Sequence, residues 1–587
     1  MKTFLTSIAG GFVALILFVL MSFAAVSILM VSLGGGNAKK PDTIVLQIDL
    51  RNDIPDQPVT NGIGVLLQDS SFIDFLNKLD AAADDPKVKG VYIRASEYGI
   101  GSARAEELRA AFKKLRKNGK FVVAHSQGMI GSGPSSLRAV AAADELWIQP
   151  YSDTLVNGIT FETFFMKDLF DNLSVKAEIE QFYEYKNAPN VYKETDYTED
   201  HREAMTALAT DVWMISLEDI AADRGFDDVQ TVKTLLEAGP LSSREIVASG
   251  LFDDEKWPED ARDAVLAKAG NGAELVSIAA YEPPSLPKKA PVIAVVGGEG
   301  PIITGGGQQG LFDTDSVFAS DRIAQALLDA GRNPDVKAIV FRVDSPGGSA
   351  VASEQIWRAV ERVSKDMGKP VVVSMGGVAA SGGYYVSAGA DAIFASRTTI
   401  TGSIGVYGGK FAIADGLRQI GINPSTISVG GEFAAAFNTE VFTDTQREQL
   451  RISLERTYDR FMVVVSEGRG IPEDRVREIA RGRIWSGSAA LDLELVTHNG
   501  GFIDAMNHAK ELADIPADTR VKIIFYPEAE GPFAAFSQGF GTGAEARESA
   551  ALLMEVLSDD RFQLILRQGL AARDGETQLS APVIIEN

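Results

Sequence analysis

Residues 85–96 read DPKVKGVYIRAS, and residues 333–344 read NPDVKAIVFRVD. Each stretch contains a turn followed by a run of β-branched and apolar residues, which is typical of a buried parallel strand. Further segments match in the same order along the chain: GKFVVAHS at 119–126 with GKPVVVSM at 368–375, AADELW at 142–147 with GADAIF at 389–394, and TEDHREAM at 198–205 with TDTQREQL at 443–450. The chain is therefore predicted to hold two copies of one α/β unit, each with a mainly parallel sheet covered by helices.

The spacing of apolar residues predicts the same elements in both halves. In the first half we expect a strand, a helix and two further strands at 43–50, 71–83, 88–95 and 120–125. In the second half the corresponding segments are 291–297, 321–331, 336–343 and 369–374. Between the halves, the stretch PPSLPKKAP at 283–291 is typical of a stiff, solvated linker.

These features divide the chain into five expected segments. They are a tail with a transmembrane anchor at 1–40, a first α/β repeat at 41–282, the linker at 283–291, a second α/β repeat at 292–526, and an extension at 527–587 that is partly helical or disordered. A chain of 587 residues is too long for one compact core, which agrees with two domains.

The composition argues against several classes of function. The formal net charge of −24 disfavours nucleic-acid binding, which needs a basic surface. The chain has no cysteine, so thiol catalysis and cysteine-ligated metal sites are excluded. Four histidines are scattered without the spacing of metal ligands: His125, His201, His498 and His508. We therefore expect neither a metal ion nor another cofactor.

An apolar run without a charged residue extends over 8–33. Such a run is long enough to span a bilayer as a helix. A cleaved signal peptide is the alternative, but the small-residue site at 22–24 lies inside the run, and cleavage there would leave 26–33 exposed. We therefore expect an uncleaved anchor. One lysine precedes the run and two follow it, so the charge bias leaves the orientation open.

Two glycine-rich stretches follow predicted strands of the second half, DSPGGS at 344–349 and MGGVAASGGYY at 375–385. The carboxyl ends of strands are where open α/β sheets bind their ligands. Ser381 lies between small residues at the expected start of a helix, where its hydroxyl can act as a nucleophile. The alternative is a solvated serine among turn glycines, which two such stretches at adjacent strand ends make less favourable.

The same stretches offer donors for an oxyanion hole. The backbone N–H of Gly382 could act together with one from Gly347 or Gly348 to stabilise a developing negative charge. Glycine at these positions also allows a ligand to approach the backbone closely.

A nucleophilic serine needs a base, and no histidine lies near in the second half. Lys186 lies twelve positions before Thr198, and the same count in the second half reaches Gly431. One half thus has a lysine where the other has none, which favours one composite site with the serine and the base from different halves. Lys193 and Lys176 are the nearby alternatives for the base. A lysine can accept a proton only when burial or a nearby cation lowers its pKa.

The motifs MGGVAASGGYY, DSPGG and TGSIGVYGG, the last starting at Thr401, together with Lys186 resemble signal peptide peptidase A of the long, duplicated type. This resemblance implies two tandem domains of the Clp protease/crotonase-like fold, with an N-terminal transmembrane helix. It implies that Ser381 is the nucleophile, that Lys186 is the general base, and that Ser403 is a second serine that orients the lysine.

The resemblance also implies a cellular role. Members of that family are anchored in the bacterial cytoplasmic membrane by a single span, with the catalytic part in the periplasm. They assemble as homotetramers and degrade signal peptides that remain in the membrane after secretory proteins are processed. Signal peptides and other hydrophobic peptides are therefore the expected substrates.

Two alternatives remain open at this point. A crotonase-like acyl-CoA enzyme would explain the DSPGG loop, but it would explain neither Ser381 and Lys186 nor the anchor. A catalytically inactive membrane scaffold is the other alternative, although the second half keeps every part of the expected site.

Overall fold

The computed structural model describes residues 41–52, 54–58, 71–97, 99–156, 158–306 and 318–527. The anchor expected at 1–40 and the extension expected after 527 lie outside these ranges. Inside them, no helix combines the length and the apolar character needed to cross a membrane.

The first half folds around a six-stranded sheet in the order β10-β1-β2-β3-β5-β9, with all neighbours parallel. Its strands are β1 (Ile44–Asp49), β2 (Val88–Arg94), β3 (Phe121–Ser126), β5 (Glu145–Ile148), β9 (Asp254–Glu255) and β10 (Glu274–Ser277). A small separate sheet contains β4 (Met129–Ile130), β6 (Asp153–Leu155) and β8 (Leu241–Ser242). The predicted strands of this half are confirmed as β1, β2 and β3.

The second half folds around an eight-stranded sheet, in which β21, β11, β14 and β15 are parallel neighbours. Its strands are β11 (Val292–Glu299), β14 (Val336–Ser345), β15 (Val371–Ala380), β16 (Ala392–Ala395), β17 (Ile400–Gly402), β19 (Ile484–Ser486), β20 (His498–Asn499) and β21 (Lys522–Tyr526). Only the pair β17–β19 in this sheet is antiparallel among the described strands. Two short strands, β12 (Ile302–Ile303) and β13 (Phe318–Ala319), pair beside it.

The helices of both halves pack on the sheets or lie in the segments that connect the strands. In the first half they are α3 (Phe72–Asp84), α4 (Ser102–Lys117), α5 (Gly133–Ala141), α6 (Lys167–Asn172), α7 (Asn190–Lys193), α8 (Glu199–Arg224), α9 (Val229–Glu237), α10 (Ser243–Ala248) and α11 (Pro258–Ala269). In the second half they are α12 (Ser320–Arg332), α13 (Ala350–Glu361), α14 (Gly382–Ser387), α15 (Ala414–Gln419), α16 (Asp444–Arg469), α17 (Glu473–Ile479), α18 (Gly487–Asp492) and α19 (Phe502–Leu512).

The long helices α8 and α16 show how closely the two halves match. Each has 26 residues and begins after a threonine, Thr198 or Thr443, whose side chain accepts a backbone N–H of the first turn. Each ends at a left-handed glycine, Gly225 or Gly470, which lets the chain leave the helix without strain on a side chain. The predicted repeat is therefore confirmed in its capping residues as well as in the order of its elements.

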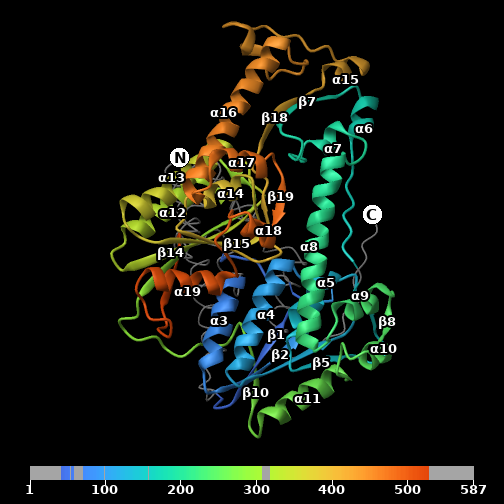
Figure 1. Cartoon of the computed structure of the whole chain (residues 1–587), viewed down its shortest axis with the longest axis vertical. Helices are drawn as coiled ribbons and strands as arrows, with labels where there is room; N and C mark the ends of the chain where they lie inside the picture. Colours follow the sequence, from blue (N-terminus) through green and yellow to red (C-terminus); the bar gives the residue numbers. More distant parts are fainter. Residues whose placement is uncertain are drawn as a thin grey trace, which may run out of the picture.

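The two halves share one of their apolar clusters. Helices α3 and α4 of the first half and α19 of the second half lie between the two sheets (Figure 1). Their buried side chains belong to one apolar cluster with the facing strands of both sheets, including Phe112, Phe502 and Val340. Burial of each such side chain stabilises the fold by about 1.5–3 kcal/mol. The halves therefore pack as layers of one body, and the linker is not their only connection.

An arm of the first half reaches the second half beyond this shared core. It contains α6, the strand β7 (Lys176–Phe182) and α7. Strand β7 pairs in antiparallel register with β18 (Val406–Ala412), so that segments more than 200 residues apart lie side by side (Figure 1). The pairing carries the turn at 183–187 to the second sheet.

Candidate active site

Ser381 lies where β15 gives way to α14. Its φ of 54° and ψ of −116° are unusual for a residue with a side chain, and such strain, about 1–3 kcal/mol, is typical of functional turns. The following glycines make the turn possible. A Cβ on Gly382 would lie 2.6 Å from Ser353 Oγ. A Cβ on Gly383 would lie 2.6 Å from the carbonyl oxygen of Ser345. The turn therefore packs tightly against the end of β14 and leaves Ser381 half-buried.

The loop after β14 packs against this turn through two glycines. Gly347 and Gly348 have φ values of 100° and 155°, which favour glycine. A Cβ on Gly347 would lie 2.6 Å from the nitrogen of Gly382. The N–H of Gly347 donates to Ser345 Oγ at 3.1 Å. The backbone bridge between this loop and β12 uses the carbonyl oxygen of Gly347 and the N–H of Ser349, and so does not use the N–H of Gly348. The backbone nitrogens of Gly348 and Gly382 thus lie close together beside Ser381.

Lys186 reaches Ser381 from the arm of the first half. Its side chain is buried, with the residue 3% exposed, and Nζ lies 3.0 Å from Ser381 Oγ. The same nitrogen lies 2.9 Å from the hydroxyl oxygen of Ser403 and 2.8 Å from its carbonyl oxygen. The three oxygens around the amine therefore all come from the second half, and the contact forms within a single chain.

Burial lowers the pKa of Lys186 from 10.5 to about 7. The neighbouring carboxylate of Glu184 is paired with Arg481 at 2.7 Å instead of with the amine. A neutral amine has two N–H donors and one lone pair. When both donors are directed to the oxygens of Ser403, the lone pair faces Ser381, whose hydroxyl can donate its proton to Nζ. These contacts suit a neutral lysine that acts as a base.

Ser403 is held in a strained turn of its own, with a φ of 50°. Its N–H donates to the carbonyl oxygen of Arg483 at 2.7 Å. Gly482 packs on the backbone of Lys186, since a Cβ there would lie 2.5 Å from the backbone nitrogen of Lys186. The segment 481–483 thus closes over the lysine. Nothing in the letters RGR separates Gly482 from an ordinary turn glycine, so the sequence alone does not reveal this contact.

Two stretches of the chain, 114–271 and 363–516, match the model of peptidase family S49. The chain belongs to this family. Protease 4 of Salmonella typhi is 29% identical over 527 residues, which cover 85% of this chain and 83% of that protein. Protease 4 of Haemophilus influenzae is 31% identical over 486 residues, which cover 79% of this chain and 76% of that protein. The chloroplastic serine protease SPPA of Arabidopsis thaliana is 26% identical over 559 residues, which cover 92% and 80%. The resemblance noted in the sequence is confirmed, and the chain is a serine peptidase.

In this S49 peptidase the alternative lysines lie away from the serine. Nζ of Lys193 donates to Gln181 Oε1 at 3.2 Å. Lys176 lies at the far end of β7, where it pairs in register with Ala412. Lys186 is thus the one of the three candidates whose amine contacts Ser381.

The first half of the S49 peptidase has a serine at the corresponding turn but no matching pair. Ser132 directly precedes α5, as Ser381 precedes α14, yet its φ is −81°. Its hydroxyl is buried and has no hydrogen-bond partner in the described part of the chain. The residue that corresponds to Lys186 by count, Gly431, has no side chain. The two serines therefore occupy corresponding places in the fold, but only Ser381 contacts a lysine among the described residues.

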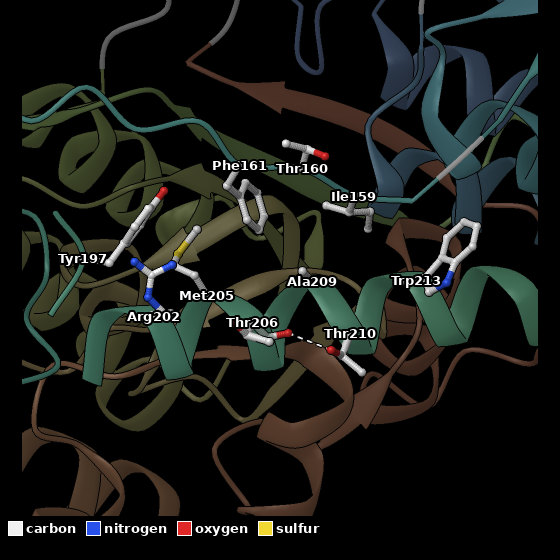
Figure 2. Close-up of a pocket in the computed structure, with 10 residues that line it drawn as sticks. All are labelled: Ile159, Thr160, Phe161, Tyr197, Arg202, Met205, Thr206, Ala209, Thr210 and Trp213. Atoms are coloured by element: carbon white, nitrogen blue, oxygen red, sulfur yellow. Dashed lines mark hydrogen bonds between the residues drawn. The ribbon is translucent and has the colours of Figure 1, made fainter. Parts of the chain in front are cut away.

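A groove on the exposed side of α8 is a separate feature (Figure 2). It has a volume of about 420 Å³ and is lined mainly by apolar and hydroxyl side chains, among them Phe161, Met205 and Trp213. The charged residue in its lining, Arg202, pairs with Asp196 at 3.0 Å. None of the six site residues predicted from the sequence lines the groove, and it has no nucleophile next to a base.

Proposed function

We propose that the protein is a membrane-bound endopeptidase with a dyad of Ser381 and Lys186. In this proposal the first repeat, 41–282, supplies the lysine, and the second, 292–526, supplies the serine, with 283–291 as their linker. One observation carries the proposal: a buried lysine nitrogen lies 3.0 Å from the hydroxyl of a strained serine. A crotonase-like acyl-CoA enzyme would not need this pair, and an inactive scaffold would have no reason to bury an amine against a serine.

The first chemical step forms an acyl-enzyme. The neutral amine of Lys186 takes the proton of Ser381 Oγ while that oxygen attacks the carbonyl carbon of the peptide. The negative charge that develops on the carbonyl oxygen is stabilised by the N–H groups of Gly348 and Gly382. The ammonium of Lys186 then gives its proton to the departing amine, which breaks the C–N bond and leaves an ester on Ser381.

The second step reverses these roles. A water molecule gives a proton to the amine of Lys186 and attacks the ester carbon, and the same two N–H groups stabilise the second tetrahedral intermediate. The proton then returns to Ser381 Oγ as the acid product leaves. Ser403 orients the amine throughout by accepting its two N–H groups. Gly347 contributes to the oxyanion hole indirectly. Its own N–H donates to Ser345 Oγ, and its conformation orients the N–H of Gly348 toward the site.

The proposed substrates are signal peptides that remain in the bacterial cytoplasmic membrane, and other hydrophobic peptides. The apolar run at 8–33 supports a single-span anchor, and the family resemblance supports a catalytic part in the periplasm and a homotetramer. N-terminal sequencing of the mature protein tests the anchor: a start near residue 1 agrees with it, and a start at or beyond Ala25 contradicts it. A C-terminal reporter tests whether the catalytic part is periplasmic.

A serine-directed acylating probe tests the dyad itself. The purified protein should be labelled at Ser381, and labelling should be lost in Ser381→Ala and in Lys186→Ala. Cleavage of a hydrophobic signal-peptide sequence in detergent should be lost in the same variants. Undiminished labelling of Ser381→Ala would rule out the assignment of the nucleophile.

A further inference from the structure

Two carboxyl groups face each other on neighbouring strands beneath the proposed site. Glu299 at the end of β11 is the register partner of Asp344 near the end of β14, and the strands are parallel. Register partners in parallel strands project to the same face of the sheet, with the strands about 4.8 Å apart. Both residues are only partly exposed, so their charges are incompletely screened.

Asp344 holds the segment that leads to Ser381. Between the register pairs Val343–Met375 and Ser345–Ala379, β14 advances by two residues while β15 advances by four. The two extra residues form a bulge in β15. The carboxylate of Asp344 accepts the N–H of Gly377 at 3.2 Å and the N–H of Val378 at 3.0 Å.

A close approach makes this contact possible. A Cβ on Gly376 would lie 2.5 Å from Asp344 Oδ2, so only glycine allows the carboxylate to lie against the bulge. The carbonyl oxygen of Asp344 also accepts the N–H of Gly300 at 2.9 Å. Three residues beyond the bulge lies Ser381. The position of the serine therefore depends on where Asp344 places its carboxylate as well as on the pairing of β15 with β17.

Glu299 has no such set of donors. Its Oε2 is buried and has no hydrogen-bond partner in the part of the chain that the structure describes. The charges that act on its pKa are those of Asp56 and Asp344, which raise it, and those of Arg104 and Arg342, which lower it. Arg342 is committed elsewhere, because it forms two contacts of 2.9 Å with the carboxylate of Asp56 and further contacts with Glu107.

The local charge balance explains why Glu299 holds a proton. Burial, followed by the charges of Asp56 and Asp344, raises the pKa of Glu299 to about 7. Burial and Asp56 also raise the pKa of Asp344, although the two N–H groups of the bulge favour its ionised form. The two N–H groups of the bulge favour an ionised Asp344, so of the two facing carboxyls Glu299 is the one that is protonated first as the pH falls through about 7.

We propose that Glu299 is a positioning residue for the serine of the dyad, in that its neutral carboxyl lets Asp344 hold the β15 bulge in place. Ionisation of Glu299 puts a second negative charge beside the carboxylate of Asp344. The repulsion displaces that carboxylate from the N–H groups of Gly377 and Val378, and Ser381 loses its alignment with Lys186. This inference rests on the proposed function for its kinetic consequence, but the movement of the bulge does not depend on it.

The profile of kcat/KM against pH should therefore have two limbs. On the acid side kcat/KM rises as Lys186 loses its proton, and on the alkaline side it falls as Glu299 loses its proton. At pH 9 about 1% of a carboxyl with a pKa near 7 remains protonated, so the wild type should work at least about tenfold below its maximum. Glu299→Gln keeps the shape and the neutral state of the side chain at every pH.

The test measures kcat/KM from pH 5 to pH 10 for the full-length wild type and for Glu299→Gln, with Glu448→Gln as the matched control on the exposed surface of α16. Glu299→Gln should lose the alkaline limb and keep the acid limb, whereas the control should keep both. Asp344→Asn, which replaces one acceptor oxygen at the bulge, should lower kcat/KM at every pH. An alkaline limb that persists in Glu299→Gln, or wild-type rates in Asp344→Asn, would overturn the proposal.

Hydrogen exchange of the amides at 376–380 gives a readout that needs no substrate. After correction for the intrinsic effect of pH, exchange in the wild type should accelerate above pH 7, and in Glu299→Gln it should not. The same profile in both proteins would overturn the inference. If the wild type cleaves no peptide at any pH, the proposed function fails, and the exchange profiles still decide whether Glu299 controls the bulge.

Discussion

Replacing Lys186 with methionine should remove one specific pH dependence from the stability of the protein. The wild-type amine has a pKa of about 7 in the folded state, against an ordinary value of 10.5. Between these values the unfolded chain binds the proton and the folded chain does not. Folding therefore becomes more favourable as the pH rises through this window, and below pH 7 the folded state bears the full cost of a buried ammonium.

The size of the effect follows from the difference of the two pKa values. Each unit corresponds to about 1.4 kcal/mol, so the buried amine lowers the free energy of unfolding by about 4 kcal/mol at pH 7. At pH 9 the cost has fallen to about 2 kcal/mol. The free energy of unfolding of the wild type, relative to that of Lys186→Met, should therefore increase by about 2 kcal/mol between pH 7 and pH 9. Methionine also leaves the oxygens of Ser381 and Ser403 without the amine, at a cost of about 1–3 kcal/mol that does not vary with pH.

The assay is urea unfolding of the full chain in detergent at pH 7, 8 and 9, with the difference between variant and wild type as the measured quantity. Other titrating groups, Glu299 among them, are present in both proteins and cancel in this difference. Ser381→Ala is the control, because it is expected to be inactive yet keeps the lysine and so should keep the wild-type slope. A difference between Lys186→Met and wild type that stays constant from pH 7 to pH 9 would refute a buried, neutral lysine.

Three further substitutions follow from the contacts of the dyad. Lys186→Arg should lower kcat/KM by about 10³-fold or more, as much as Lys186→Ala, because guanidinium keeps its proton; substantial activity in Lys186→Arg would contradict the general base. Ser403→Ala should lower kcat/KM by about 10- to 100-fold, less than loss of the lysine, since its carbonyl oxygen still accepts from Nζ; a larger loss than in Lys186→Ala would contradict this role. Gly482→Ala should lower kcat/KM, and it should lower the free energy of unfolding by about 2 kcal/mol or more. The φ of Gly482 is 85°, and the new Cβ would meet the backbone of Lys186. Wild-type values of both quantities would show that this close approach is absent.

The sequence predicts most of the sheets because their strands are short apolar runs between turn residues. The run expected at 336–343 is found as β14, two residues longer, and the helix expected at 321–331 is found as α12. The strand expected to end at 374 continues to Ala380, because the bulge at its end is built from glycines that carry no apolar pattern. Such a bulge depends on the acceptor that fills it, here Asp344, and that partner is distant in the sequence.

Pairings between strands far apart in the chain could not be predicted from the sequence. Strands β7 and β18 lie side by side, but their residues are mostly half-exposed and neither has a run of buried side chains that would identify its partner. The nucleophile was predicted from local chemistry, since small residues surround Ser381 on both sides. Lys186 required a comparison between the repeats and the family resemblance, because the segment that closes over it, 481–483, lies almost 300 residues away.

The division of the dyad between the two halves has a physical consequence. A lysine in water has a pKa of about 10.4 and is almost wholly protonated at neutral pH, so it cannot accept the proton of a serine. In the proposed mechanism Lys186 can act as a base only where β7 pairs with β18 and Gly482 closes over its backbone. Before the halves pack, the serine lacks its base and the amine is charged. The same contacts that bring Nζ to Ser381 thus bury the amine and lower its pKa, and under the proposed mechanism packing of the two halves would also activate the serine.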